Sequence, residues 1–381
     1  SFPFAEVEKI FAAELGAHPT DLFESFEETP FASASIGQVH KATIKNGDRV
    51  AVKVQRPGIQ KIIEVDLEIM LHLATLAERH IEEMSVFRPV KIVEEFARTL
   101  EKEIDYTIEA TNMERIARQF LDTPHVYIPK VFRETSTLRI LTTEFIDGIK
   151  VSNIDRLEDA GLDRKLITAR GADISLAQIF ETGFFHADPH PGNIFVLPGN
   201  VICLLDFGMV GVVDRNTRED FVELVDSIVH QDEIYTSQIL LKLADRDEEP
   251  DMRQLQRDVA DFLGQHLYKP LKDIEFGKLL QHLLEVASRH RLRIRPDIFL
   301  MMKALTTVEG VAALLDPEFD LVAQVEPFIK RVKLERMAPN RIATDLTRLA
   351  SQSFQFLQTF PRDLLEITRL VRQKKLTFRH E

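Results

Sequence analysis

The sequence predicts an α+β protein with two lobes, a small lobe built from a β-sheet and helices and a larger, mainly helical lobe. Strand-like alternation is concentrated before residue 148, whereas helical spacing of apolar residues dominates after it. The chain has 381 residues, 44% of them hydrophobic and 29% charged, so it can bury an extensive core. We expect a small lobe with N-terminal and long inserted helices at 1–147, a helical lobe at 148–330, and basic amphipathic helices at 331–381.

Charge and cysteine content exclude several classes of protein. The 48 Lys and Arg against 61 Asp and Glu give a net charge of −13, which argues against nucleic-acid binding because phosphates attract a basic excess. The single Cys203 excludes a disulfide framework and a cysteine zinc site, and fits a reducing compartment. No uncharged run of about 18 residues and no signal-like start occur. We therefore expect no transmembrane segment, a cytoplasmic-side location peripheral to a membrane at most, and a fragment that begins abruptly at Ser1.

A β-hairpin is the clearest local element of the small lobe. Alternating residues predict strands at Gln38–Ile44 and Arg49–Gln55, and Asn46-Gly47-Asp48 between them is typical of a tight turn. One or two short helices are expected at residues 5–29. The other expected elements are helices at 59–83 and 90–120 and strands at 126–132, 138–145, 194–197 and 201–205.

Three short segments carry residues suited to phosphoryl chemistry. In Val50-Ala51-Val52-Lys53-Val54, alternation places Ala51 and Lys53 on one face of a strand, where the ammonium can meet a phosphate or a carboxylate. His186–Asn193 contains two prolines and a glycine, so it is a rigid loop, and it holds Asp188 and Asn193 five positions apart. The kinase catalytic loop uses this interval, with Asp as proton acceptor and Asn as metal ligand.

The third segment is an apolar strand that ends in Asp206-Phe207-Gly208. The Asp206 carboxylate can bind Mg²⁺, and the glycine permits a sharp change in chain direction. The order of the three segments along the chain predicts a kinase-like site for ATP and Mg²⁺. The fold expected from them is a two-lobed protein-kinase-like fold.

The sequence also resembles the UbiB-type atypical kinases, which are protein-kinase-like proteins linked to ubiquinone and other isoprenoid-lipid metabolism. Besides the two loops above, the resemblance rests on 31–40, 50–58 and Glu103-Ile104-Asp105-Tyr106 with Glu109-Ala110, and it extends from Pro3 to about Leu315. It implies that an alanine-rich loop replaces the glycine-rich hairpin of ordinary kinases and favours ATPase-like over protein-kinase activity. Since methyl groups restrict positive φ, we expect a stiffer loop and a different nucleotide pose. The expected nucleotide contacts are Ala32, Ser33, Ala34, Ser35, Ile36, Gly37, Val39, Ala51, Lys53, Glu144, Phe145 and Ile146.

An acidic partner for Lys53 is expected on the helix after Val90. Glu103, Asp105 and Glu109 are the candidates. The resemblance implies that Glu109 orients Lys53 and that Glu103 and Asp105 form a separate Glu-x-Asp motif, which in the family meets a Lys-x-Gly-Gln segment N-terminal to the kinase core. Whether Glu103 or Glu109 makes the ion pair is left open by the sequence.

The expected activity is ATP- and Mg²⁺-dependent phosphoryl transfer by an atypical kinase or ATPase. Lys53 would hold the phosphates, Asn193 and Asp206 the metal, and Asp188 the attacking oxygen. Alanine replaces the loop arginine of many protein kinases, and no Ala-Pro-Glu follows Gly208. A lipid, a quinone precursor or water therefore fits as acceptor better than a protein, and the resemblance implies support of ubiquinone biosynthesis.

Other interpretations remain open from the sequence. The chain could be a pseudokinase that acts as a nucleotide-gated scaffold, or a protein kinase. A metal hydrolase using His186, Asp188 and His190 is disfavoured because it leaves Asn193 and Asp206 unexplained. We expect His190 to be a structural hydrogen-bonding residue of the loop.

The C-terminal segment predicts a peripheral membrane contact. Residues 330–381 contain 12 basic and 5 acidic residues. Leu364, Ile367, Leu370 and Val371 alternate with Arg369, Arg372, Lys374 and Lys375 in a pattern typical of a helix that lies on an anionic bilayer. The alternative is that the apolar residues pack on the helical lobe.

Overall fold

The computed structural model describes residues 1–34, 36–80, 89–246, 248–266 and 276–338. The chain divides into two compact units, Ser1–Phe328 and Ile329–Glu381. Helix α14 (Leu321–Arg336) contains the boundary between them. The features described below belong to the first unit. The predicted C-terminal amphipathic helices fall outside the described residues.

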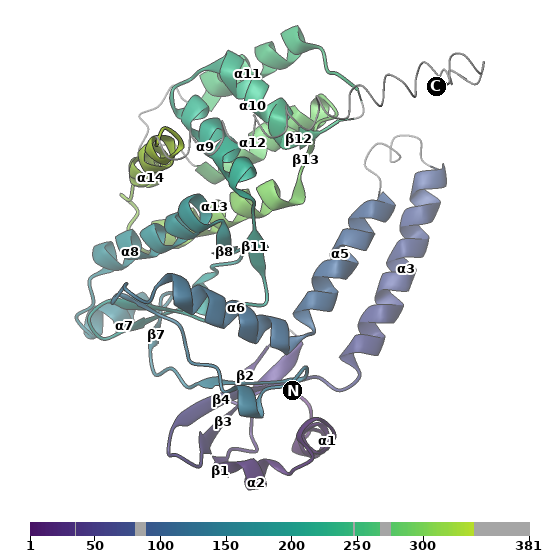
Figure 1. The fold of residues 1–381 in the computed structure, drawn as a ribbon, viewed down its shortest axis with the longest axis vertical. Helices are drawn as coiled ribbons and strands as arrows, with labels where there is room; N and C mark the ends of the chain where they lie inside the picture. Colours follow the sequence, from purple (N-terminus) through teal and green to yellow (C-terminus); the bar gives the residue numbers. More distant parts are fainter. Residues whose placement is uncertain (35, 81–88, 247, 267–275, 339–381) are drawn as a thin grey trace, which may run out of the picture. The chain divides into compact units, whose positions relative to one another are not determined.

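An antiparallel sheet forms the small lobe (Figure 1). Its strands run in the order β1-β3-β4-β6, and β2 pairs with β3. Their bounds are β1 (Phe23–Phe26), β2 (Ala32–Ser33), β3 (Gly37–Ile44), β4 (Arg49–Gln55) and β6 (Ile140–Glu144). Strands β3 and β4 confirm the predicted hairpin. The one or two short helices predicted at residues 5–29 are confirmed as two, but strand β1 was not predicted; its Phe23 and Phe26 place their rings against Phe11, 6.0 and 5.7 Å between centroids.

Helices α1 (Phe4–Leu15) and α2 (Pro19–Leu22) precede the sheet, and α1 covers one of its faces. Val50, Val52 and Val54 of β4 are fully buried against this helix. Because successive side chains of a strand point to opposite faces, Ala51 and Lys53 lie on the other, open face. The alternation predicted from the sequence thus separates a packed face from a face that can bind a ligand.

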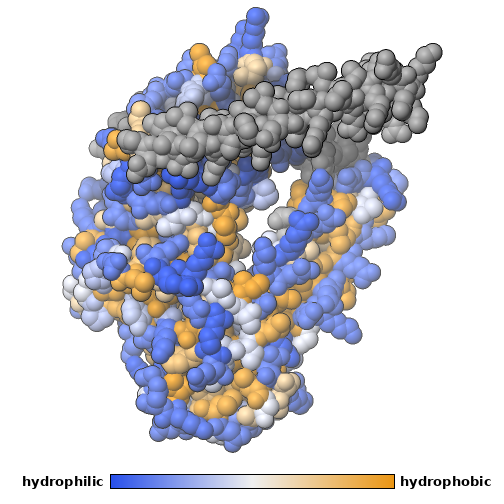
Figure 2. All heavy atoms as spheres, viewed as in Figure 1, coloured by the Kyte–Doolittle hydropathy of each residue, from blue (hydrophilic) through white to orange (hydrophobic). Residues whose placement is uncertain are grey.

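Two helices project from the sheet as a pair, α3 (Ile59–His80) and α5 (Pro89–Glu103), and α6 (Tyr106–Gln119) follows them (Figure 1). The single helix predicted at 90–120 was wrong. The segment forms two helices, α5 and α6, which are divided at Asp105. The Asp105 carboxylate accepts the backbone N–H of Thr107 at 2.9 Å and the Thr107 hydroxyl at 2.6 Å, so Asp105 is the N-cap at which α6 begins. Figure 2 shows hydrophobic surface along the helix pair, whose exposed apolar residues include Ile62, Val65, Ile69, Leu73, Leu76, Ile92 and Phe96.

The helical lobe consists of helices around short sheets. Its helices are α7 (Ile154–Asp159), α8 (Arg164–Ala177), a π-helix (Gln178–Thr182), α9 (Arg215–Val229), α10 (Glu233–Leu243), α11 (Met252–His266), α12 (Phe276–Arg289) and α13 (Pro296–Leu315), with a 3-10 turn at Pro191–Asn193. A second 3-10 turn, Arg133–Thr135, packs on β6 of the small lobe. Its strands are β5 (Val126–Tyr127), β7 (Ile149–Lys150), β8 (Phe184–His186), β9 (Ile194–Leu197), β10 (Val201–Leu204), β11 (Val210–Val212), β12 (Ala244–Asp245) and β13 (Arg293–Ile294).

Several strands differ from the expectation. β9 has the predicted bounds and β10 ends one residue early. β5 stops after two residues because Pro129 lacks the N–H that a continuing ladder needs. The pairs β8–β11 and β12–β13 and strand β7 were not predicted, since two or three residues are too few for alternation to be visible in a sequence.

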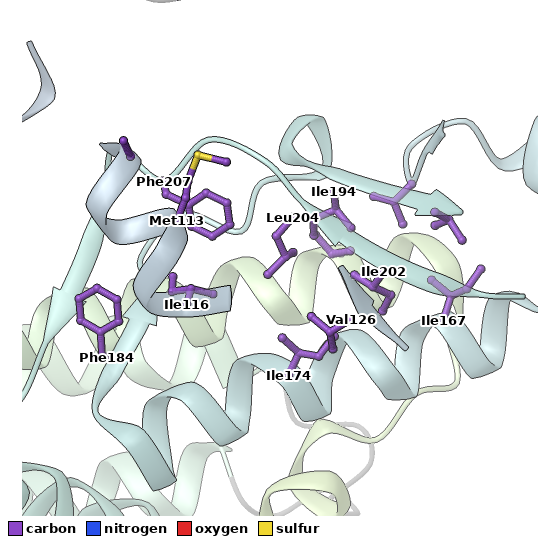
Figure 3. Packing of buried hydrophobic residues seen from close by; sticks show 14 of the residues in the cluster. Met113, Ile116, Val126, Ile167, Ile174, Phe184, Ile194, Ile202, Leu204 and Phe207 are labelled. Atoms are coloured by element: carbon purple, nitrogen blue, oxygen red, sulfur yellow. The ribbon is translucent and has the colours of Figure 1, made fainter. Parts of the chain in front are cut away.

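One hydrophobic cluster connects the two lobes (Figure 3). Met113 and Ile116 of α6 pack toward Leu204 of β10 and toward Phe207, and α8 closes the other side with Ile174. The small-lobe residues that belong to the same cluster are Ile36, Tyr106 and Leu141. The cluster therefore holds α6 between the sheet and the helical lobe.

Helix α13 is long and apolar enough to cross a membrane by length and composition alone. This is weak evidence, because the core helix of a globular lobe has the same properties. Nine residues of α13 are buried, and the helix packs against α8 and α12. The helix gives no clear transmembrane span.

Gly37 should be intolerant of a side chain. A Cβ at this position would lie 2.5 Å from the carbonyl oxygen of Val54 and 2.7 Å from the Tyr106 hydroxyl. We expect Gly37→Ala to lower the free energy of unfolding in urea by about 1–3 kcal/mol through overpacking. Gly264→Ala in α11 is the control, because nothing lies within 4 Å of its Cβ position, and it should stabilise by up to about 1 kcal/mol. Equal effects of the two substitutions would contradict the close approach.

Candidate nucleotide site

A cleft of about 570 Å³ lies between the open face of the sheet and two loops of the helical lobe. This volume is within the range typical of small-molecule and cofactor sites. Its lining residues are Phe31, Ala32, Ser33, Ala34, Val39, Lys41, Ala51, Lys53, Glu109, Met113, Leu141, Thr143, Glu144, Phe145, Ile146, Asp147, Gly148, Lys150, Gly192, Asn193, Phe195, Leu205 and Asp206.

A buried ion pair lies in the cleft. The Lys53 Nζ is 2.9 Å from Oε2 and 3.2 Å from Oε1 of Glu109, and the two side chains are 16% and 6% exposed. The ammonium also lies 5.0 Å from the centroid of the Tyr106 ring. Of the three acidic candidates, the structure pairs Glu109 with Lys53.

The charges around Lys53 keep it protonated. Burial lowers the pKa of Lys53, but the carboxylates of Glu109 and Asp206 outweigh burial, so the pKa is raised above its ordinary value. Burial also raises the pKa of Tyr106, so its hydroxyl stays neutral beside the ammonium. The cleft therefore presents a permanent positive charge close to the carboxylate at the start of the Asp-Phe-Gly segment.

The other two acidic residues have different surroundings. Asp105 is the N-cap of α6, and its carboxylate accepts hydrogen bonds from Thr107. It is not among the residues that line the cleft. Glu103 is the last residue of α5, and its Cγ lies 3.8 Å from the position that a Cβ on Gly208 would take. Asp105 is thus the cap of α6, and Glu109 lies one turn into the helix.

The β9–β10 hairpin brings the two expected metal ligands together. Ile194 at the start of β9 is opposite Leu204 at the end of β10, so Asn193 and Asp206 flank the same end of the hairpin. The Leu205 N–H donates to the Asn193 carbonyl at 2.8 Å, which ties the two loops to each other. Both side chains line the cleft.

The Asp-Phe-Gly segment has a constrained backbone. Asp206 has a φ of 59°, a left-handed conformation that aspartate tolerates better than most residues, and its Oδ1 accepts the Gly208 N–H at 3.3 Å. Phe207 is fully buried beside the His186 ring, 5.3 Å between centroids. The Asn112 amide of α6 donates to the Phe207 carbonyl at 3.0 Å, so α6 positions this segment as well as Lys53.

The loop before β9 is fixed by its histidines. Burial lowers the pKa of His186, and the neutral ring accepts the Asp188 N–H on Nδ1 at 3.3 Å. The His190 Nδ1 accepts the Gly192 N–H at 3.0 Å, so His190 is the structural residue that we expected. Asp188 is partly exposed and is not among the residues that line the cleft, although Gly192 and Asn193 of the same loop are.

The donor set suits Mg²⁺ rather than a transition metal. Asn193 and Asp206 offer an amide and a carboxylate oxygen, and Mg²⁺ is typically held by one or two such ligands together with substrate phosphates. Within the described ranges, no three His, Cys, Asp or Glu side chains gather as a metal site. The arrangement thus gives no support to the hydrolase interpretation based on His186, Asp188 and His190.

The alanine-rich loop closes on itself. The Ala34 N–H donates to the Gly37 carbonyl at 3.0 Å, and the Gly37 N–H donates to the Ala34 carbonyl at 3.4 Å. Both amides therefore already have a hydrogen-bond acceptor. Ala32, Ser33 and Ala34 line the cleft, whereas Ser35 falls outside the described residues. Ile36 is buried in the core cluster and Gly37 approaches Val54, so neither is among the lining residues.

The connector between the lobes forms the other end of the cleft. Glu144, Phe145 and Ile146 all line it, as expected. The Phe145 N–H donates to the Arg49 carbonyl at 3.0 Å, and the Glu144 carboxylate accepts the Tyr127 hydroxyl at 2.6 Å. Burial and this bond raise the pKa of Tyr127 to about 12.

Some lining residues were missed by the sequence analysis. Lys41 shares the open face of β3 with Val39, a relation that period-two alternation could have revealed. Leu141 and Thr143 reach the cleft because β6 pairs with β4, with Leu141 opposite Lys53. Met113 enters from α6, and no local pattern marks it.

The sheet over a helical lobe, the lysine–glutamate pair and the Asp-Phe-Gly segment at the end of a hairpin define a protein-kinase-like fold. Comparison with known families agrees: residues 1–240 match the ABC1 atypical kinase-like domain and residues 259–320 match the UbiB helical domain. The chain belongs to the ABC1/UbiB family of atypical kinase-like proteins, which confirms the resemblance noted in the sequence.

Named relatives cover most of the chain. It is 33% identical over 349 residues to "Probable protein kinase UbiB" of Marinobacter nauticus, covering 91% of this chain and 64% of that protein. It is 34% identical to "Protein ACTIVITY OF BC1 COMPLEX KINASE 7, chloroplastic" of Arabidopsis thaliana, covering 91% of this chain and 50% of the relative. The chain thus spans between half and two thirds of the length of these relatives.

A solved structure shares the fold. It is Rv3197 of Mycobacterium tuberculosis in complex with erythromycin, with a TM-score of 0.65 and 24% sequence identity, covering 86% of this chain and 83% of the other. The two-lobed kinase-like fold predicted from the sequence is therefore confirmed.

Loss of the carboxylate from the ion pair should destabilise the protein. Glu109→Gln leaves the Lys53 ammonium buried without its main partner, and breaking a buried pair of this kind costs about 3–5 kcal/mol. We expect urea unfolding to show a loss of that size. Glu114→Gln on the same helix is the matched control, because its pair with Arg133 is exposed and contributes at most about 1 kcal/mol. Similar losses for both variants would show that burial of the pair has no energetic consequence.

Proposed function

We propose that this chain binds ATP with Mg²⁺ and catalyses phosphoryl transfer as an atypical kinase or ATPase. The observation that carries the proposal is that Lys53, held by Glu109, opens into the same cleft as Asn193 and Asp206. Phosphoryl transfer depends mainly on positioning and on neutralising phosphate charge, and these side chains supply both.

Each group has a proposed role. Lys53 binds the α- and β-phosphates, and Glu109 fixes the direction of the ammonium. Asn193 and Asp206 would hold Mg²⁺, which neutralises charge on the transferred phosphoryl group. Asp188 orients the attacking oxygen or accepts its proton. The adenine lies between β3 and the connector, where Phe31 and Phe145 make an edge contact 5.7 Å between ring centroids.

The proposed acceptor is water, a lipid or a phenolic quinone precursor rather than a protein. Support comes from the sequence after Gly208, which lacks the Ala-Pro-Glu of a peptide platform, and from Ala187 in place of the loop arginine. A role in ubiquinone biosynthesis is proposed from the family and from relatives named UbiB. Nucleotide turnover measured with and without such lipids, precursors and protein substrates separates the acceptors.

Substitution of the phosphate-binding and metal-binding groups should abolish turnover. We expect Lys53→Ala and Asp206→Asn each to lower Mg²⁺-dependent phosphate release from ATP by about 100-fold or more, since each removes charge stabilisation at the reacting phosphates. Asp155→Asn is the control, because Asp155 is exposed on α7, outside the cleft lining. Undiminished turnover in both cleft variants would refute the assigned roles.

A nucleotide-gated scaffold is the second candidate, because a cleft able to hold nucleotide is also what a pseudokinase needs. It requires that the chain bind ATP but release phosphate no faster than Asp206→Asn. Equilibrium binding of a fluorescent ATP analogue, measured beside turnover, distinguishes this outcome from a protein that neither binds nor hydrolyses ATP.

We also propose a peripheral membrane contact on the cytoplasmic side through the basic residues near the C-terminus. Removal of 361–381 takes away Arg369, Arg372, Lys374 and Lys375 together with the adjacent apolar residues. Co-sedimentation with vesicles that contain anionic lipid should therefore fall in the truncated chain and also at high salt. Unchanged co-sedimentation after truncation would exclude this segment as the anchor.

A further inference from the structure

A lysine of the helical domain contacts the aspartate of the proposed catalytic loop. The Lys303 Nζ of α13 lies 3.7 Å from Oδ2 of Asp188 and donates to the Met209 Sδ at 3.5 Å. The side chains of Lys303 and Asp188 are 37% and 39% exposed, so water reaches both. Lys303 falls in the segment that matches the UbiB helical domain, whereas its two partners belong to the kinase-like domain. The contact therefore joins the two domains at the loop.

The three charged residues of α13 have different partners. Asp297 pairs with Arg295, directly before the helix, and the Glu309 carboxylate accepts the N–H of Gly277 in α12 at 2.7 Å. The first contact is local to the start of α13, and the second holds α13 to α12. Lys303 is the charge of α13 that meets the catalytic loop. The Lys303 side chain is partly exposed, and the contact with Asp188 accounts for its position in the middle of α13.

The helix holds Lys303 in place. Met302 and Ala304 on either side of it are buried, and the Thr307 hydroxyl donates to the Lys303 carbonyl at 2.9 Å within the helix. Because α13 packs along α8, the backbone of Lys303 has a fixed position relative to the lobe. Helix α13 therefore holds the Lys303 ammonium in a fixed position beside the loop.

The loop needs an external cation. His186–Asn193 contains neither Lys nor Arg, and its two histidines use Nδ1 to accept backbone N–H groups. The Lys53 ammonium is engaged by Glu109. An aspartate that must be aimed at an attacking oxygen is held in one orientation by a positive charge beside it.

We propose that Lys303 is a positioning residue of the phosphoryl-transfer site, which orients the Asp188 carboxylate through their ion pair. This inference rests on the proposed function, because it assigns Lys303 a part in the same reaction. It also gives the helical domain a direct effect on the chemistry: a displacement of α13 would change the environment of the catalytic loop.

The test compares Lys303→Met with Lys303→Arg in steady-state ATP hydrolysis. We expect Lys303→Met to lower kcat about 10-fold while the KM for ATP changes less than about twofold, because Asp188 is misoriented but the nucleotide contacts remain. Lys303→Arg should restore most of the lost rate, since it keeps the charge. Lys165→Met is the matched control, because Lys165 makes an ion pair of the same 3.7 Å length with Glu318 at an exposed position. It should leave kcat unchanged.

A double substitution separates positioning from a structural effect. If Lys303 acts through Asp188, Lys303→Met should have no further effect on kcat in an Asp188→Asn background. Lys303→Gln takes the place of the methionine variant if the latter does not fold. Two results would overturn the inference and leave the proposed function intact. The first is that the wild-type chain turns over ATP and Lys303→Met or Lys303→Gln has the same kcat as wild type. The second is that Lys303→Met lowers kcat as much in the Asp188→Asn background as in the wild-type background. Absence of ATP turnover in the wild-type chain would instead refute the proposed function, and the role of Lys303 with it.

Discussion

The buried ion pair between Lys53 and Glu109 is the interaction on which the rest of the site depends. Each ion loses hydration on burial, and only a close partner charge offsets that cost, so β4 and α6 must keep a fixed relative position. Tyr106 contributes to this constraint, because its ring contacts the ammonium and its hydroxyl occupies the space that Gly37 leaves free. The open face of the sheet is thereby joined to α6.

Helix α6 transmits this constraint to the helical lobe. Glu109 and Asn112 are three residues apart and so lie on one side of the helix, where the first holds Lys53 and the second holds the Phe207 carbonyl. Met113 then anchors the helix in the core shared by the two lobes. The N-cap Asp105 determines where the helix begins and therefore which residues face the cleft. A residue of the family motif thus acts here through helix geometry.

The alanine-rich turn changes how the cleft can hold phosphates. Ala34 and Gly37 bond to each other across the turn, so their amides are not donors to a ligand as long as the turn keeps this form. Binding then depends more on side chains at the base of the cleft, Lys53, Asn193 and Asp206, than on loop backbone.

The two-lobed class, the β3–β4 hairpin and the segments that supply the cleft were predictable from the sequence alone, because alternation, turn residues and short motifs act between neighbours in the chain. Only the tertiary structure decided that Glu109, 56 residues from Lys53, makes the ion pair and that Asp105 divides the predicted helix. The tertiary structure also shows that Ile36 is buried in the core and that Lys303 pairs with Asp188 of the proposed catalytic loop. Such pairings depend on how α6 and α13 pack, and packing between distant segments leaves no periodic signal in a single sequence.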